Sequence, residues 1–260
     1  MIAPMLDGRA ILLTGATGGI GRRLAIGLAE AGADLALHYR SRPEEAGALA
    51  ARIRALGREA VLLQGDLADP AQARVVVDGT VAHFGRCDVL VNNAGGAWRR
   101  PFVEVTPELW RRTFAANVDT AFHCTSAVVP HMVRAGGGKI VNVGSIVADL
   151  ATSVLVPYCS AKAALHMFTK ATAVALAPHR ITVNAVAPGV VLTERMQVRL
   201  ENPRNRERVL TRTPTGSLVR PEDLVGVVVF LASSLSDHLT GQILTVDHGY
   251  SIAGLEWEPE

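Results

Sequence analysis

The sequence predicts an α/β fold, a doubly wound parallel sheet of about seven strands with helices on both faces. Short apolar runs alternate with longer helical stretches along the 260 residues, which is typical of parallel strands joined by right-handed crossovers. A glycine cluster stands between the first strand-like run and the first helical stretch. No repeat, composition break or low-complexity linker divides the chain, so we expect residues 1–260 to form one domain.

The first half of the chain carries strand and helix signals in regular alternation. Apolar residues at Ile20, Leu24 and Leu28 recur at helical spacing directly after the glycine cluster. We expect strands at 9–14, 34–39, 60–64 and 87–92, and helices at 20–31, 43–56 and 69–84.

The second half continues the alternation up to one polar segment. Thr106 and Pro107 open a stretch long enough for a single extended helix over 106–131. We expect strands at 139–143, 182–187 and 242–247, and helices at 158–177 and 221–233. Residues 189–220 are polar and rich in arginine, so we expect a loop with short helices there. Its part at about 190–216 is the natural place for a substrate lid.

The bulk composition is that of a globular enzyme. Apolar residues make up 49% of the chain, and a net charge of +2 indicates neither a nucleic-acid nor a membrane-surface partner. No apolar run approaches the roughly 18 to 20 residues that cross a bilayer, and residues 1–8 lack the features of a signal peptide. Cys87, Cys124 and Cys159 have no metal-ligand spacing, so we expect buried, reduced thiols, no metal and a cytoplasmic location.

The glycine cluster, Thr14-Gly-Ala-Thr-Gly-Gly-Ile-Gly21, indicates a phosphate-binding turn of the Rossmann type. Glycines let the backbone turn tightly and approach a pyrophosphate, and the following helix N-terminus supplies free N–H groups and a partial positive charge. The strand–turn–helix context favours a dinucleotide site over a plain loop. The expected contacts from this turn are Gly15, Thr17, Gly19, Ile20 and Gly21.

The end of the second strand bears on the choice of cofactor. A carboxylate there would bond the adenosine ribose hydroxyls and repel a 2′-phosphate. Tyr39 holds the position instead, followed by Arg40, Ser41 and Arg42, whose donor groups suit a phosphate dianion. We therefore expect NADP(H) to be preferred over NAD(H). The alternative is that these arginines merely solvate the start of a helix.

Two further strand ends face the same crevice. Asp66 would accept a hydrogen bond from the adenine amino group, or it would cap the next helix together with Asp69. The small residues of Asn92-Asn-Ala-Gly95 leave room for a cofactor, and Asn92 is expected to pin neighbouring backbone groups. The expected cofactor contacts from these ends are Asp66, Leu67, Asn93, Ala94 and Gly95.

Three residues of the second half carry the expected chemistry. Ser145 follows a buried strand, so its hydroxyl points off the carboxyl edge of the sheet. Tyr158 and Lys162 are four residues apart at the start of a helix, which places the ammonium near the phenol. A nearby cation, together with oxidised nicotinamide, lowers a phenol pKa from about 10. Tyr158 is therefore expected to give or take a proton at neutral pH.

In this order and spacing the motifs resemble the classical short-chain dehydrogenase/reductase family over essentially the whole chain, in particular its 3-oxoacyl-carrier-protein reductase-like members. The matching pieces are Thr14-Gly15-x-x-x-Gly19-x-Gly21, Asn92-Asn93-Ala94-Gly95, Asn117, Ser145, Tyr158-x-x-x-Lys162, Pro188-Gly189 and Thr193.

The resemblance implies a role for each piece. Ser145 would hold the substrate oxygen, Tyr158 would exchange the proton, and Lys162 would bind the nicotinamide ribose and lower the tyrosine pKa. Asn117 would position a relay water. The nicotinamide carboxamide would be held by Pro188, Gly189, Val190 and Thr193. Family members are commonly tetramers, so a homotetramer or a dimer is expected. His248 departs from the family's usual Val-Asp-Gly-Gly, and we expect it to have a structural role.

The expected reaction is hydride transfer between NADP(H) and a ketone or secondary-alcohol carbon. The substrate stays open between a 3-oxoacyl thioester on an acidic carrier protein and a sugar, polyol or small cyclic ketone. A basic face for the carrier would be formed by Arg134, Lys139 and Arg180, and the substrate mouth by Trp98 and Met196. Arg99 or Arg100 would bind a substrate carboxylate or phosphate, or remain solvated.

Two other functions are weighed against this reaction. A non-catalytic NADP(H) sensor on the same fold would not need Ser145, Tyr158 and Lys162, all of which are present. A sugar-nucleotide epimerase or dehydratase with a related core is usually a longer chain. Both alternatives are less favoured than the dehydrogenase/reductase.

Overall fold

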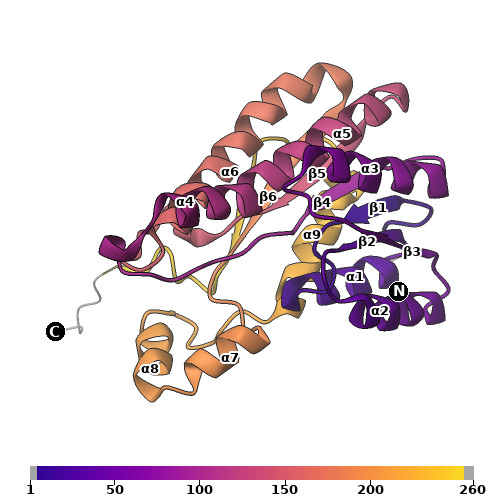
Figure 1. Cartoon of the computed structure of the whole chain (residues 1–260). Coiled ribbons are helices and arrows are strands. Elements are labelled where there is room, and N and C mark those ends of the chain that lie inside the picture. Colours follow the sequence, from indigo (N-terminus) through magenta and orange to yellow (C-terminus); the bar gives the residue numbers. More distant parts are fainter. Residues whose placement is uncertain (1–4, 255–260) are drawn as a thin grey trace.

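The computed structural model describes residues 5–254 and contains a seven-stranded sheet in the order β3-β2-β1-β4-β5-β6-β7 (Figure 1). All neighbouring strands pair in parallel. The strands are β1 Ala10–Leu13, β2 Asp34–Tyr39, β3 Ala60–Gln64, β4 Val89–Asn92, β5 Gly138–Val143, β6 Ile181–Pro188 and β7 Ile243–Val246. The predicted fold class is therefore confirmed, while the domain ends at residues 1 and 260 lie outside the described residues.

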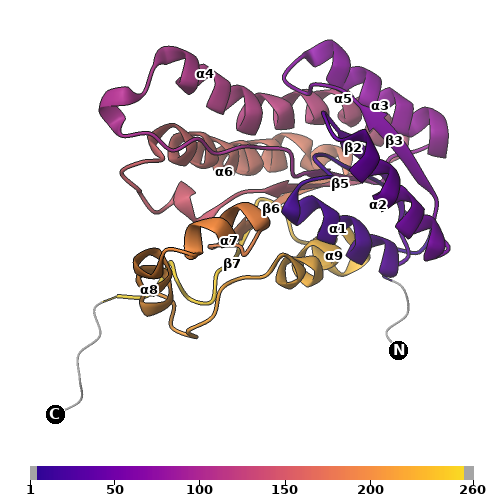
Figure 2. The ribbon, with the colours of Figure 1, turned by 60° about the horizontal axis from the view of Figure 1, so that its bottom comes forward.

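Helices cover both faces of this sheet (Figure 2). They are α1 Gly19–Glu30, α2 Pro43–Ala55, α3 Pro70–Phe84, α4 Pro107–Phe114, α5 Thr120–Arg134, α6 Val156–Leu176, α7 Glu194–Leu200, α8 Pro203–Thr211 and α9 Val225–Ala232. Figure 2 shows α1, α2 and α9 on one side of the sheet and α3, α4, α5 and α6 on the other. Strands covered on both faces need apolar side chains at every position, which is why β1 reads AILL and is buried throughout.

Two apolar clusters form the core, one on each face of the sheet. Ile11 and Leu13 of β1 pack with Leu24 and Leu28 of α1, whereas Leu12, between them in sequence, joins the cluster beneath α3 and α5. The alternation follows from the two-residue period of a strand. Cys87 and Cys124 lie in this second cluster, where burial raises the pKa of both thiols to about 12. Cys159, also expected inside, is only partly buried.

The single helix expected over 106–131 is interrupted, which corrects that prediction. A π-helical turn, Ala115–Asp119, separates α4 from α5 and holds Asn117. The Asn117 side-chain amide donates to the Thr113 carbonyl oxygen at 2.9 Å, one turn back in the chain. This bond occupies an acceptor of the regular helical ladder, and π-turns of this kind are frequent at functional sites. Sequence periodicity alone does not reveal a single inserted residue.

The polar segment after β6 forms the two short helices that were expected, α7 and α8. Figure 1 shows them projecting from the body of the molecule, away from the helices that flank the sheet. Arg195 of α7 donates to the Ala97 carbonyl oxygen at 2.8 Å. Glu194, at the start of α7, pairs with Arg22 of α1. Within residues 5–254 no helix combines the length and apolar character needed to span a membrane.

Candidate active site

Two adjoining cavities lie along the carboxyl edge of the sheet. One, of about 1080 Å³, is lined by Ser145, Tyr158 and Lys162. The other, of about 730 Å³, is lined by the glycine-rich turn and the end of β2. Ile20 and Thr193 line both cavities, which therefore form one continuous crevice. A crevice at this edge is where open α/β sheets bind their ligands.

The glycine-rich turn is built so that a side chain would not fit. Gly15 has φ +66°, a left-handed conformation that favours glycine. A methyl group added at Gly21 would lie 2.3 Å from the Gly15 carbonyl oxygen. No side chain caps α1, so the N–H groups of its first turn remain available beside the 730 Å³ cavity. Free N–H groups at a helix N-terminus suit a diphosphate, and the turn therefore fits a dinucleotide.

Two residues that sequence reasoning missed hold this turn in place. The Gly15 N–H donates to Nδ1 of the buried His38 at 3.1 Å, so the ring is neutral and its Nε2–H donates to the Gly65 carbonyl oxygen at 3.0 Å. Burial lowers the pKa of His38, which favours this neutral form. Thr14 Oγ1 accepts from the N–H groups of Asn93 and Ala94, at 2.9 and 3.0 Å.

The backbone-pinning role expected of Asn92 belongs to Asn93, which also lines the nucleotide cavity. The Asn93 side-chain amide donates to the carbonyl oxygens of Thr14 and Gly15, at 2.9 and 3.1 Å. Asn92, predicted to pin the backbone, is buried and donates instead to Asn142 Oδ1 at 2.9 Å. The reason is strand alternation: the side chain that faces the crevice is one residue later than assumed. Ala94 and Gly95 line the nucleotide cavity as predicted.

At the adenosine end, Arg40, Ser41 and Asp66 line the nucleotide cavity, but Tyr39 does not. Arg42, Leu67 and Thr17 line it as well. The residue of β2 that contributes a side chain to this cavity is His38, so the expected contact through Tyr39 is corrected. The cap of α3 is Asp69, which accepts from the Ala71 N–H at 2.8 Å, and not Asp66.

Ser145, Tyr158 and Lys162 come together as predicted. Ser145 follows β5 in extended backbone and is buried, while Tyr158 stands in the first turn of α6. One turn further, the buried Lys162 donates from Nζ to the Val143 carbonyl oxygen at 2.7 Å. Its Nζ lies 5.6 Å from the centroid of the Tyr158 ring.

The lowering expected for the Tyr158 pKa depends on bound oxidised nicotinamide, and it stays a prediction; the surroundings that the chain itself provides act in the other direction. Burial raises the pKa of the phenol to about 12, and its hydrogen bond with the Ser145 side chain acts in the opposite direction without cancelling that effect. The Lys162 ammonium is also desolvated, and it donates to a carbonyl oxygen. Burial lowers the pKa of Lys162 to about 8.

Asn117 supports the floor of the crevice. Its side-chain amide donates to the Gly96 carbonyl oxygen at 2.7 Å, and its Oδ1 accepts from the Gly96 N–H at 3.3 Å. A methyl group at Gly95 would lie 2.7 Å from the same Oδ1, so this approach requires glycine. The Asn117 side chain is thus engaged with protein backbone on both of its polar atoms.

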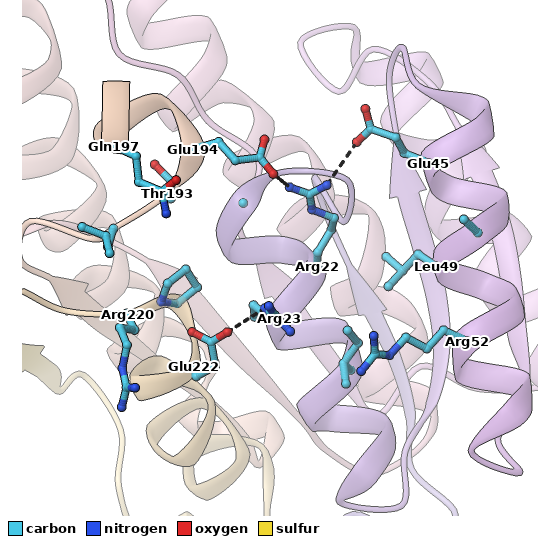
Figure 3. Close-up of a pocket in the computed structure, with 15 residues that line it drawn as sticks. Arg22, Arg23, Glu45, Leu49, Arg52, Thr193, Glu194, Gln197, Arg220 and Glu222 are labelled. Carbon is cyan, nitrogen blue, oxygen red and sulfur yellow. Dashed lines mark hydrogen bonds and ion pairs between the residues drawn. The ribbon is translucent and has the colours of Figure 1, made fainter. Parts of the chain in front are cut away.

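The residues at the end of β6 and directly after it line the crevice; their contact with the nicotinamide stays a prediction. Pro188, Gly189 and Val190 line the larger cavity, and Thr193 packs against Gly19 at the start of α1. Figure 3 shows Thr193 and Glu194 beside Arg22, whose guanidinium lies 3.7 Å from Glu45 on its other side. These contacts border a third hollow, of about 630 Å³, between α1, α2 and the start of α7.

Of the three residues expected near the substrate, two line the larger cavity. Met196 lines the larger cavity as predicted, and so does Arg99. Trp98 does not; it lines the nucleotide cavity, where the Arg112 guanidinium lies 4.5 Å from its ring centroid. The aromatic wall expected for the substrate is therefore corrected, because the turn after Gly95 directs Trp98 towards α4.

Lys139 and Arg180 cannot form a face at this site. They lie at the amino ends of β5 and β6, whereas Ser145 follows the carboxyl end of β5, so the whole sheet separates them from the crevice. Lys139 is buried and pairs with Asp237 at 2.7 Å. His248 has φ +57°, in a left-handed conformation that favours glycine, and its Nε2 lies 4.0 Å from Asp223.

Known proteins similar to this chain are oxidoreductases. The family model described as Enoyl-(Acyl carrier protein) reductase matches residues 15–251. An L-rhamnose 1-dehydrogenase (NAD(P)(+)) from Sphingomonas sp. strain SKA58 is 42% identical over 94% of this chain and 97% of that protein. A 3-oxoacyl-[acyl-carrier-protein] reductase from Staphylococcus aureus is 33% identical over 93% of this chain and 97% of its own. Among solved structures, a gluconate 5-dehydrogenase from Burkholderia cenocepacia in complex with NADP and tartrate is 38% identical with a TM-score of 0.92, covering 97% and 98% of the two chains.

Proposed function

This chain belongs to the classical short-chain dehydrogenase/reductase family, and from that premise we propose that it interconverts a secondary alcohol and a ketone of a sugar or sugar acid with NADP(H). Ser145, Tyr158 and Lys162 line one cavity that adjoins the glycine-rich turn, and this observation carries the proposal. The relatives named for rhamnose and gluconate favour a polyhydroxylated substrate.

The nicotinamide cofactor supplies or accepts the hydride when it is bound, and the chain holds the substrate and moves the proton. Ser145 Oγ holds the substrate oxygen, and Tyr158 Oη gives its proton to that oxygen in reduction or takes one in oxidation. Lys162 holds the nicotinamide ribose hydroxyls and brings a positive charge to the phenol. The Asn117 side-chain amide already donates hydrogen bonds to the carbonyl oxygens of Gly96 and Thr113. A relay water would therefore be bound by the backbone carbonyl groups of the π-helical turn and not by the Asn117 side chain.

Arg40, Ser41 and Arg42 support NADP(H) over NAD(H). All three line the nucleotide cavity at the end of β2, where a 2′-phosphate would lie. Asp66, whose carboxylate lies 3.8 Å from the Arg40 guanidinium, is the one carboxylate paired with it in the described chain. A pair at that distance between two exposed groups is weak, so Arg40 remains available to a phosphate.

The rival functions find less support. A cofactor sensor does not require a proton donor and its partners, yet Ser145, Tyr158 and Lys162 are kept together in one cavity. A carrier-bound 3-oxoacyl thioester gains no support from the residues expected to form a basic face for its carrier, because Lys139 and Arg180 lie at the opposite edge of the sheet. The helices α7 and α8 are placed to close over the substrate as a lid, since Met196 and Val209 line the larger cavity.

Replacing Tyr158 by Phe tests the proposal. We expect turnover with NADPH to fall by about 10²- to 10⁴-fold, the usual contribution of a positioned general acid, while NADPH binding measured by fluorescence titration persists. Ser160→Ala removes a hydroxyl from the same turn of α6, one bonded to the Val156 carbonyl oxygen, and is the matched control that keeps its activity. Full activity in Tyr158→Phe would refute the mechanism.

The reaction itself is tested by initial rates on a panel of aldoses, polyols, aldonates and 3-oxoacyl thioesters. We expect oxidation of a polyhydroxylated member with NADP⁺, seen as absorbance of the reduced nicotinamide. Silence on the whole panel, with NADPH still bound, would favour the sensor.

A further inference from the structure

The cavity beside Ser145 and Tyr158 is lined by positive side chains and by no negative one. Besides Lys162, five arginines line it, namely Arg99, Arg195, Arg199, Arg208 and Arg212, and no aspartate or glutamate does so among residues 5–254. The neighbouring hollows differ in this respect. The nucleotide cavity contains Asp66 and Glu194, and Figure 3 shows glutamates facing the arginines of the hollow by α1.

Arg195 is set apart from the other four arginines. It lines both cavities and donates to the Ala97 carbonyl oxygen, so it belongs to the border with the nucleotide site. Arg99, Arg199, Arg208 and Arg212 line the substrate side alone. The phosphates of the cofactor are matched by the N-terminus of α1 and by Arg40 in the other cavity, and they do not account for this second group.

The four substrate-side guanidinium groups have no carboxylate partner in the part of the chain that the structure describes. Several arginines elsewhere are paired with carboxylates, namely Arg22 with Glu194 and Glu45, Arg23 with Glu222 and Arg58 with Asp34, whereas others such as Arg52 and Arg74 are not paired within the described residues. The four arginines here differ from the unpaired ones elsewhere in lining one cavity together. Several guanidinium groups gathered around one cavity without a counter-charge repel one another, and an anion inside the cavity relieves that repulsion.

The arginines stand at the end of the cavity formed by α7 and α8. Arg199 lies in the last turn of α7, and Arg208 and Arg212, four residues apart, share one side of α8 and its end. The Arg212 guanidinium lies 4.9 Å from the Tyr250 ring centroid, an arrangement that orients its fork. Arg99 comes from a different element, the loop after β4 that the Arg100 N–H fixes to the Val154 carbonyl oxygen at 3.0 Å.

We propose that the substrate is an anion whose carboxylate or phosphate is held by these arginines while its hydroxyl carbon reacts beside Tyr158. The inference rests on the proposed function and narrows it from polyhydroxylated compounds in general to acids. In the direction of oxidation the secondary alcohol loses a hydride to NADP⁺ and a proton to Tyr158, giving the oxo acid, and the anionic group is unchanged. The arginines supply binding and selection against neutral sugars and polyols of the same carbon skeleton.

Matched substrates test the proposal. Initial rates with NADP⁺ are compared for four- to six-carbon aldonates, the corresponding neutral polyols and their terminal phosphate esters. We expect kcat/KM for an acid to exceed that for its neutral counterpart by about tenfold or more, as charge-assisted hydrogen bonds to arginine allow. The preference should decline as salt is added, because screening weakens it. Comparing kcat/KM for the aldonates with kcat/KM for the phosphate esters shows which of the two anionic groups the site binds.

Variants on α8 and α7 separate a built site from general positive charge. In Arg199→Ala combined with Arg208→Ala, the ratio of kcat/KM for acid over neutral compound should fall by about tenfold or more, towards 1. Arg204→Ala removes an exposed arginine of α8 that does not line the cavity, and this matched control should keep the wild-type ratio. Arg208→Lys keeps the positive charge but loses the forked guanidinium. Its ratio of kcat/KM for acid over neutral compound should lie between those of the double variant and the Arg204→Ala control.

The outcomes distinguish this inference from the proposed function. Turnover of neutral polyols equal to that of the acids, or an unchanged ratio in the double variant, overturns the anion site and leaves the dehydrogenase intact. When the whole panel is silent, binding of succinate to the NADPH-loaded protein is followed by fluorescence. Binding that the double variant loses supports the anion site and counts against the reaction, whereas equal or absent binding in the two proteins overturns the site.

Discussion

At the scale of single residues, Arg40 is the side chain that we expect to distinguish NADPH from NADH. It lines the nucleotide cavity at the end of β2 and would bond a 2′-phosphate. We expect Arg40→Ala to weaken NADPH binding by about tenfold or more, the effect of a charge-assisted hydrogen bond, and NADH binding much less. Fluorescence titration with each cofactor measures both. An unchanged preference would assign the phosphate to another group, with Arg42→Ala as the variant to compare.

Lys162 gives the protein a pH dependence whose sign follows from its burial. The pKa of its ammonium is lowered from 10.5 to about 8 in the folded protein, so between these values the unfolded chain binds more protons and the free energy of unfolding rises with pH. The contribution of Lys162 to the free energy of unfolding changes by roughly 3 kcal/mol between pH below 8 and pH above 10.5, at about 1.36 kcal/mol per pKa unit. Below pH 8 the penalty for burying the charge is fully present.

Lys162→Met isolates this effect from every other titrating group. Urea denaturation measures the free energy of unfolding of the variant and of the wild type. The variant should exceed the wild type by the largest amount near pH 7. Its advantage should shrink steadily as the pH is raised towards 10. A difference independent of pH would contradict the buried ammonium. Tyr158 adds the opposite slope above pH 10, because its raised pKa makes the folded state hold its proton longer.

At the scale of elements, the turn between β1 and α1 depends on a close contact that only glycine permits. A methyl group at Gly21 would meet the Gly15 carbonyl oxygen at 2.3 Å, so Gly21→Ala must displace the phosphate-binding backbone. We expect it to lower the free energy of unfolding by about 1–3 kcal/mol and to weaken NADPH binding at least tenfold. Thermal denaturation and fluorescence titration check the two effects.

Gly47→Ala in α2 is the control for that substitution. A methyl group there meets nothing within 4 Å, and glycine inside a helix is less favourable than alanine by about 0.5–1 kcal/mol. This variant should therefore be slightly more stable than the wild type and bind NADPH normally. Equal destabilisation of both variants would show that the close contact at Gly21 is not the cause.

At the scale of the whole molecule, the outer side of α5 and α6 is apolar and exposed. Phe122 is 51% exposed, Met167 62% and Val174 79%, and Phe122 makes an edge contact with Phe168 across the two helices. In the homotetramer that the family resemblance implies, we expect a second copy of the chain to cover this face, since exposed apolar patches mark association surfaces.

Light scattering of Phe122→Asp combined with Met167→Asp tests this face. The wild type should have the mass of a tetramer, and the double variant half of that mass or less, because charges on an apolar interface are costly to bury. Val133→Asp places a charge elsewhere on α5 and serves as the control. It should keep the mass of the wild type. An unchanged mass in the double variant would place the interface elsewhere.

The sequence by itself determined the order and type of the elements. Short apolar runs bounded by turn residues and by helical stretches predict strands, so β2 and β3 could be predicted to the residue. Ser145, Tyr158 and Lys162 were found because each stands at a fixed distance from a strand end or helix start. Glycines of the nucleotide turn were found for the same reason.

Only the tertiary structure decided which side chains meet and what their surroundings do to them. The π-helical turn at Asn117, the support of Gly15 by His38 and the direction of Trp98 each depend on contacts between segments far apart in sequence. The pKa of Tyr158 depends on how completely the phenol is desolvated, which no local pattern records. The sequence shows the arginines of α7 and α8 only as part of a polar, arginine-rich segment. They line one cavity, with no carboxylate beside them among residues 5–254, because these helices fold against the carboxyl edge of the sheet.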